Sequence, residues 1–125
     1  MCIHFDKRGS LWVGTLGSGL NRMANIGSGV FQRYTEKDGL PSNVINAIVE
    51  DNQGNIWLST NGGISKFSYQ TSGFKNYDER DGLQSNEFNQ GAFNKGSGGS
   101  IYFGGINGFN VFAPDKINDN DIKPL

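Results

Sequence analysis

The sequence Asp51-Asn52-Gln53-Gly54-Asn55-Ile56-Trp57-Leu58-Ser59-Thr60 is the strongest indication of the fold, because a related copy of it lies elsewhere in the chain. The copy is Asp6-Lys7-Arg8-Gly9-Ser10-Leu11-Trp12-Val13-Gly14-Thr15, at an offset of 45 residues, and the same offset carries Trp57 to Tyr102. A second block, residues 31–43, matches residues 74–86 at an offset of 43. The 125 residues therefore contain just under three repeats of about 43 to 45 residues.

Each repeat is predicted to fold as short antiparallel strands. In the middle repeat, apolar and β-branched runs predict four of them, at Val44–Glu50, Ile56–Ser59, Ile64–Phe67 and Phe74–Tyr77. The segments between them are rich in Gly and Asn, which tolerate positive φ in tight turns. Four strands in a repeat of this length predict an all-β fold, a β-propeller fragment of just under three four-stranded antiparallel blades.

The predicted blades cover residues 1–117, with approximate limits at 1–40, 41–83 and 84–117. Because Met1–Phe5 aligns with the end of the middle unit's first strand, the first blade is expected to lack most of its innermost strand. In the last blade, residues 113–117 are expected to replace the fourth strand. Closed propellers have roughly 4 to 8 blades, so we expect a piece of a larger ring or a chain that assembles with others.

Composition excludes several classes of protein. The 19 Gly and 15 Asn disfavour a helical bundle. No apolar run approaches the ~20 residues that span a bilayer. The net charge of −1 comes from 11 basic and 12 acidic residues spread along the chain, which gives no basic stripe and argues against nucleic acid as a partner.

The residues that could do chemistry have simpler structural interpretations. The only histidine, His4, lies on a predicted strand, and the single cysteine, Cys2, has no partner for a disulfide. Residues 51–55 lack the bidentate Glu of a calcium loop, and the glycine-rich residues 14–19 precede a strand, not a helix, so both are predicted to be turns. We therefore expect no enzyme activity from this chain, no cofactor and no metal.

Polar residues in the connections suggest a ligand site. The blade-to-blade connections and the turns between second and third strands should meet at one rim of the propeller, where neutral hydrogen-bonding groups suit a carbohydrate. The predicted ligand-binding residues are Ser42, Asn43, Asn61, Ser85, Asn86, Asn89 and Asn107. The alternative is that Asn43 and Asn86 satisfy backbone groups in tight connections.

The repeats resemble the two-component regulator propeller repeat. The matching residues are Gly39-Leu40-Pro41-Ser42-Asn43-Val44, Asp51, Gly54 through Thr60, and Gly63-Ile64. The earlier copy, Gly9 through Thr15 with Gly19-Leu20, is also similar, and the third unit, from Asn86 to Ile117, looks like the family's last blade.

This resemblance implies the periplasmic sensor region of a hybrid two-component histidine kinase that recognises an oligosaccharide. It implies that residues 118–125 begin an exit towards an immunoglobulin-like module that is absent here, that further blades belong to the parent chain, and that the parent forms a homodimer. Two alternatives stay open. One is a structural propeller segment that contacts other proteins, and the other is a lyase-type propeller enzyme, which the lone His4 disfavours.

Overall fold

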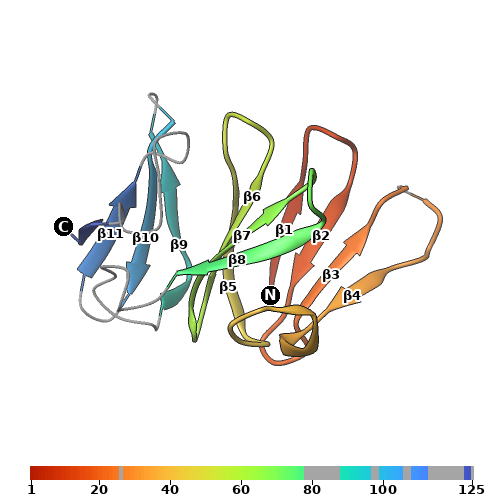
Figure 1. Cartoon of the computed structure of the whole chain (residues 1–125), viewed down its shortest axis with the longest axis horizontal. Coiled ribbons are helices and arrows are strands. Elements are labelled where there is room, and N and C mark those ends of the chain that lie inside the picture. Colours follow the sequence, from red (N-terminus) through yellow and green to blue (C-terminus); the bar gives the residue numbers. More distant parts are fainter. Residues whose placement is uncertain (26, 78–87, 97–98, 106–107, 113–122, 125) are drawn as a thin grey trace.

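Three small antiparallel sheets make up the described part of the chain. The computed structural model describes residues 1–25, 27–77, 88–96, 99–105, 108–112 and 123–124. Within those ranges the strands form three four-stranded sheets, and the sheets stand side by side like the blades of a propeller (Figure 1). The predicted all-β propeller fold is confirmed.

The strands follow the repeat. The first sheet holds β1 (Cys2–Phe5), β2 (Leu11–Gly14), β3 (Leu20–Met23) and β4 (Gln32–Tyr34). The second holds β5 (Ile45–Glu50), β6 (Ile56–Thr60), β7 (Gly63–Ser68) and β8 (Gly73–Tyr77). The third holds β9 (Phe88–Lys95), β10 (Ile101–Gly105), β11 (Gly108–Phe112) and β12 (Lys123–Pro124). Among the described residues there is a single 3-10 turn, η1 (Glu36–Asp38), in the segment of chain that connects the first sheet to the second.

Two expectations about the outer limits of the repeats differ from the structure. The inner strand β1 is present with four residues against six in β5, and every one of its residues pairs with β2, so the first blade does not lack most of this strand. The third sheet has a fourth strand, because β12 pairs with β11. Strand β12 lies within residues 118–125, which the sequence predicts to be a segment that leaves the propeller. Residues 113–117, the predicted replacement for the fourth strand, lie outside the described part of the chain.

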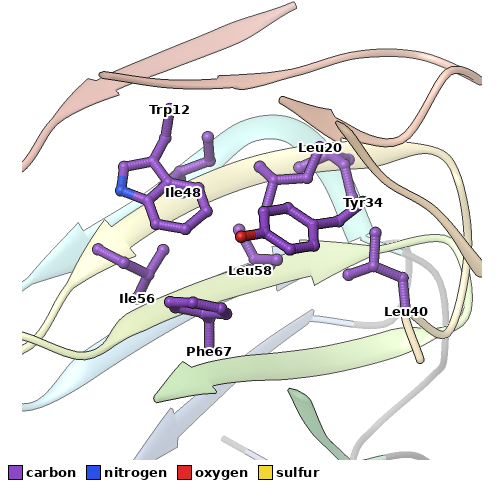
Figure 2. Close-up of a cluster of buried hydrophobic side chains, with 9 residues drawn as sticks. Trp12, Leu20, Tyr34, Leu40, Ile48, Ile56, Leu58 and Phe67 are labelled. Carbon is purple, nitrogen blue, oxygen red and sulfur yellow. The ribbon is translucent and has the colours of Figure 1, made fainter. Parts of the chain in front are cut away.

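Two apolar cores lie between the sheets. The first joins the first and second sheets, where Trp12, Leu20 and Tyr34 on one side meet Ile56 and Phe67 on the other (Figure 2). The second joins the second and third sheets and contains Trp57, Ile101 and Phe103 with four other side chains. Because each sheet buries apolar side chains only against its neighbour, these two seams hold the repeat together.

The tryptophans act as plugs between blades, as the repeat predicts. Trp12 and Trp57 are fully buried, and each stacks on a tyrosine near the end of its own sheet, Tyr34 and Tyr77 respectively, with interplanar angles of 24°. The equivalent Tyr102 is only half-buried. The plug interpretation is therefore confirmed for the two tryptophans and holds less well for the tyrosine.

A bulge lets the inner strand of the second sheet serve both cores. The pairing of β5 with β6 shifts register between Ile45 and Ala47. Strict alternation would place Ile45 and Ile48 on opposite faces, yet both join the first core, whereas Ala47 and Val49 join the second. On the first sheet, by contrast, Ile3 occupies the position equivalent to Ile48 and is 62% exposed, compared with 3%.

Candidate functional site

The strands end at two opposite rims. We call the rim with residues 15–19, 35–44 and 61–62 the connection rim, and the rim with residues 6–10, 51–55 and 69–72 the turn rim. The antiparallel order of the strands fixes this division, because each strand crosses the sheet once between rims. The predicted ligand residues belong to the connection rim.

Three of the predicted ligand residues can be placed there. Ser42 Oγ accepts a hydrogen bond from Val44 N at 3.1 Å, and Asn43 Oδ1 accepts one from Glu36 N at 2.8 Å. Asn61 is exposed, and its Oδ1 accepts a hydrogen bond from the buried Asn46 Nδ2 at 2.9 Å. The Asn61 backbone N–H also donates to Val44 O at 3.3 Å, so the turn at residue 61 lies beside residues 42–44.

The side chains of the other four predicted residues fall outside what the structure describes. Ser85, Asn86 and Asn107 lie outside the described residues, and Asn89 is on β9. The carboxamide oxygens of Asn43 and Asn61 serve local structure, as the alternative interpretation expects for Asn43. The side-chain nitrogens of Asn43 and Asn61 are still available as hydrogen-bond donors, because neither has an acceptor among the residues that the structure describes.

The turn rim carries a repeated polar motif. In the first blade, Asp6 Oδ1 accepts hydrogen bonds from Arg8 N and Ser10 N, both at 2.9 Å, and Oδ2 accepts Trp12 Nε1 at 2.7 Å. Arg22, which pairs with Trp12 across the strands, places its guanidinium carbon 5.3 Å from the centre of that ring. The carboxylate thus closes the turn and fixes the indole, and the cation covers the ring.

The second blade repeats this motif. Asp51 Oδ1 accepts Gln53 N and Asn55 N, both at 2.9 Å, and Oδ2 accepts Trp57 Nε1 at 2.8 Å. The cation is Lys66, whose Nζ lies 5.5 Å from the centre of the Trp57 ring. This use of Asp51 confirms that residues 51–55 form a hairpin turn and explains why its carboxylate is buried.

Tyr69 links the first motif to the second blade. Its hydroxyl donates to Asp6 Oδ2, and guanidinium carbons of Arg8 and Arg22 lie 4.4 and 4.8 Å from its ring centre. Burial alone would raise the pKa of Asp6, but the hydrogen bonds from Tyr69, Trp12 and the turn N–H groups outweigh burial and lower it. Burial, with the hydrogen bond to Asp6, raises the pKa of Tyr69.

Sequence comparison identifies the repeat. The profile of the family described as "Two component regulator propeller" matches residues 39–62, which include the Asp51 turn and Trp57. A solved structure, the extracellular domain of a protein assigned as a hybrid two component system in B. thetaiotaomicron, is 39% identical, covers 90% of this chain and superposes with a TM-score of 0.86. Residues 39–62 of this chain carry the two-component regulator propeller repeat.

Two other comparisons define how far the relationship extends. Histidine kinase P4 of Formosa agariphila is 34% identical over 89 residues, or 71% of this chain. Virginiamycin B lyase from Staphylococcus aureus superposes on 100% of the chain and 40% of the lyase with a TM-score of 0.70, but at 20% identity this likeness shows the fold alone. The regulator propeller repeats here span only 6% of the kinase and 15% of the B. thetaiotaomicron structure.

The histidine and the glycine-rich segment that the sequence singles out are engaged in structure. His4 Nε2 lies 3.0 Å from Glu50 Oε1, so it joins the inner strands of neighbouring blades, as a structural role for this histidine predicts. Thr15 N donates to Gly19 O at 3.1 Å, so the glycine-rich segment closes a turn after β2, and Gly17 N and Gly19 N both donate to Asn43 O. In the described ranges no three His, Cys, Asp or Glu residues are grouped to hold a metal, and no helix has the length and apolar character to cross a bilayer.

The sequence missed the Asp–Trp–cation motif as a unit. One signal was available: Asp6 and Asp51 each precede a tryptophan by six residues, and a basic residue follows at Arg22 and Lys66. The bond from Tyr69 to Asp6 had no such signal, because it joins residues 63 apart and the aligned residue of the first repeat is Asn25.

Proposed function

We propose that this chain is part of the extracytoplasmic sensor propeller of a hybrid two-component histidine kinase and that it recognises an oligosaccharide. The observation that carries the proposal is the 39% identity over 90% of the chain to the extracellular domain of a B. thetaiotaomicron protein assigned as a hybrid two component system. The 34% identity to a histidine kinase supports the same role. In this role the propeller lies in the periplasm, further blades and an immunoglobulin-like module complete the parent chain, and the parent works as a homodimer.

The proposed ligand site is the connection rim. It uses Ser42, Asn43, Asn61, Ser85, Asn86, Asn89 and Asn107 as neutral hydrogen-bonding groups towards sugar hydroxyls. The described members support a donor role, because the oxygens of Asn43 and Asn61 already accept hydrogen bonds while their amide nitrogens do not donate within the described part of the chain. Ligand capture at this rim would change the placement of paired sensors and thereby the output of the kinase.

The test exploits this division between oxygen and nitrogen. Asn61→Ala would remove the acceptor of the buried Asn46, so Asn61→Asp is the sharper variant: it keeps an oxygen for Asn46 and removes the donor. Asn52→Asp on the exposed part of the turn rim adds the same charge elsewhere and is the control. Calorimetry with maltohexaose, xylohexaose, cellohexaose and mannohexaose, on the chain within its parent sensor, gives the affinity.

The expected result is binding of one of these sugars that weakens about tenfold in Asn61→Asp, the cost of one well-placed hydrogen bond, and stays unchanged in Asn52→Asp. Equal affinities in all three proteins would refute the rim site. Absence of binding to any soluble glycan by the intact sensor would favour the alternative, a structural segment that contacts other proteins.

A further inference from the structure

A second pocket lies on the turn rim, at the opposite end of the strands from the proposed rim site. It has a volume of about 390 Å³ and is lined from both of the first two blades. Arg8 and Lys66 supply two cations, Gln53, Asn55 and Gln70 supply carboxamides, and Tyr69 and Ser68 complete the wall. Pockets for small ligands have volumes of roughly 300 to 1,000 Å³, so this one has room for a small molecule.

Within the described part of the chain, the two cations of this pocket have no carboxylate as an ion-pair partner. Among the residues that the structure describes, neither Arg8 nor Lys66 has a carboxylate within ion-pair distance, and the only ion pair found is that of His4 with Glu50. The nearby carboxylates of Asp6 and Asp51 are 2% and 1% exposed, and both oxygens of each already accept hydrogen bonds from turn N–H groups and indole nitrogens. The exposed side of the pocket is therefore positive, and the acceptors that line it are neutral carboxamide and hydroxyl oxygens.

The walls of the pocket are also held in place. The Arg8 guanidinium stacks on Tyr69, whose hydroxyl is bound to Asp6, and a stacked guanidinium keeps its N–H edge free for a ligand. Gln53 and Asn55 extend from a turn whose backbone is fixed by Asp51. A site that is rigid before binding loses less entropy when a ligand enters.

We propose that this pocket binds a small carboxylate ligand that also carries hydroxyl groups, the chemistry of a sugar acid. The guanidinium and ammonium groups bind the carboxylate, with the planar fork of Arg8 suited to bidentate contact. The three carboxamides and the Ser68 hydroxyl bind ligand hydroxyls, to which they can donate and from which they can accept. The inference goes beyond the proposed function, because it concerns the opposite rim and a charged ligand and stands even if the neutral glycan site fails.

The experiment is a titration of the whole 125-residue chain, followed by NMR of the backbone and side-chain amides. Sodium glucuronate, glucose and sodium sulfate are added separately at constant ionic strength. The expected result is a saturable shift of the side-chain amides of Gln53, Asn55 and Gln70 with glucuronate, and no shift with glucose. Equal responses to glucuronate and sulfate would mean an unspecific anion site and would overturn the proposal, as would no response to glucuronate.

Two variants test the assignment of the cations. Arg8→Gln and Lys66→Gln each remove one charge at a side chain that is exposed or half-buried, and each should weaken glucuronate binding about tenfold, the cost of one charge-assisted hydrogen bond. Arg33→Gln removes the same charge from an exposed position on β4 that does not line the pocket, and should leave binding unchanged. Equal binding by all four proteins, or equal loss in all three variants, contradicts the proposed site.

Discussion

The Asp6 carboxylate offers a sharp test of how the blades are held together. It is 2% exposed and accepts four hydrogen bonds: from Arg8 N, Ser10 N, Trp12 Nε1 and the Tyr69 hydroxyl. Replacing Asp6 by Ala leaves all four donors without this acceptor. Arg8 is exposed and its N–H can turn to water, but Ser10 and Trp12 are buried, and each buried donor left unpaired costs about 1–3 kcal/mol.

The expected loss for Asp6→Ala is therefore about 3 to 5 kcal/mol of the free energy of unfolding, a large share of the ~5–15 kcal/mol typical of a domain. Asp51→Ala should cost less, about 2 to 3 kcal/mol, because Asp51 accepts three hydrogen bonds, and only one of its donors, Trp57, is a buried residue. The difference between the two variants measures the contribution of the interblade Tyr69 bond together with Ser10.

Urea unfolding followed by tryptophan fluorescence is the assay, since Trp12 and Trp57 are the only tryptophans and each lies at one of the two Asp sites. Asp38→Ala is the control, because Asp38 is exposed and its carboxylate accepts one hydrogen bond among the described residues, from Thr35 N at 2.9 Å. This change should cost about 1 kcal/mol or less. A loss below about 1 kcal/mol for Asp6→Ala, or the same loss for Asp6 and Asp38, would refute the argument.

Three further outcomes follow from the same geometry. The pKa of Asp6 is lower in the folded protein than in the unfolded chain, where it has the ordinary value of about 3.9. The ionised Asp6 therefore stabilises the fold fully above that pH, and the stabilisation is lost as the pH falls through the lower folded-state pKa. Acid unfolding of Asp6→Asn should lack this loss of stability. The raised pKa of Tyr69 should place one phenol titration, followed by absorbance at high pH, above the ordinary value of about 10. Asp6→Asn should lower this pKa part of the way, because it removes the contribution of Asp6 and leaves the larger contribution of burial. In thermal unfolding, Gly19→Ala should destabilise the protein by about 1–3 kcal/mol more than Gly27→Ala. Both glycines have positive φ, but only at Gly19 would an added Cβ clash with a neighbour, the carbonyl oxygen of Tyr34. Equal losses in the two variants would contradict this argument.

The fold was predictable because its signals are local and repeated. The strand of residues 56–60, for example, follows from its β-branched and aromatic residues and from Gly54, whose φ of +84° the turn requires. The buried plug at Trp57 follows from the need of each sheet to cover its neighbour. The bulge between Ile45 and Ala47 was not predictable, because it depends on how two cores share one strand.

The candidate sites were less predictable because they depend on contacts between blades. The sequence placed Asn43 and Asn61 on one rim correctly, since strand order alone fixes the rim. Its alternative interpretation also gave Asn43 a backbone partner, but it did not identify that partner as Glu36 N and did not indicate that the oxygen of Asn61 accepts from Asn46. The turn-rim pocket combines Arg8 of one repeat with Lys66 of the next. Neither residue is unusual in the sequence, and only the packing of the sheets brings both to one pocket.

The third blade shows that the Asp–Trp–cation motif behaves as one unit. Its turn has the same backbone bonds as the second, since Gly96 N donates to Ser100 O at 2.8 Å and Gly99 N to Gly96 O at 3.0 Å. Yet Gly96 stands where the other blades have Asp, Tyr102 stands where they have Trp, and Val111, the cross-strand partner of Tyr102, replaces the cation. A fully buried indole N–H needs an acceptor, which only the Asp supplies, whereas the hydroxyl of a half-buried tyrosine can reach water. The three positions therefore fit together as a set: without the carboxylate a buried indole N–H would have no acceptor in this turn, and without the indole the cation would have no ring to cover.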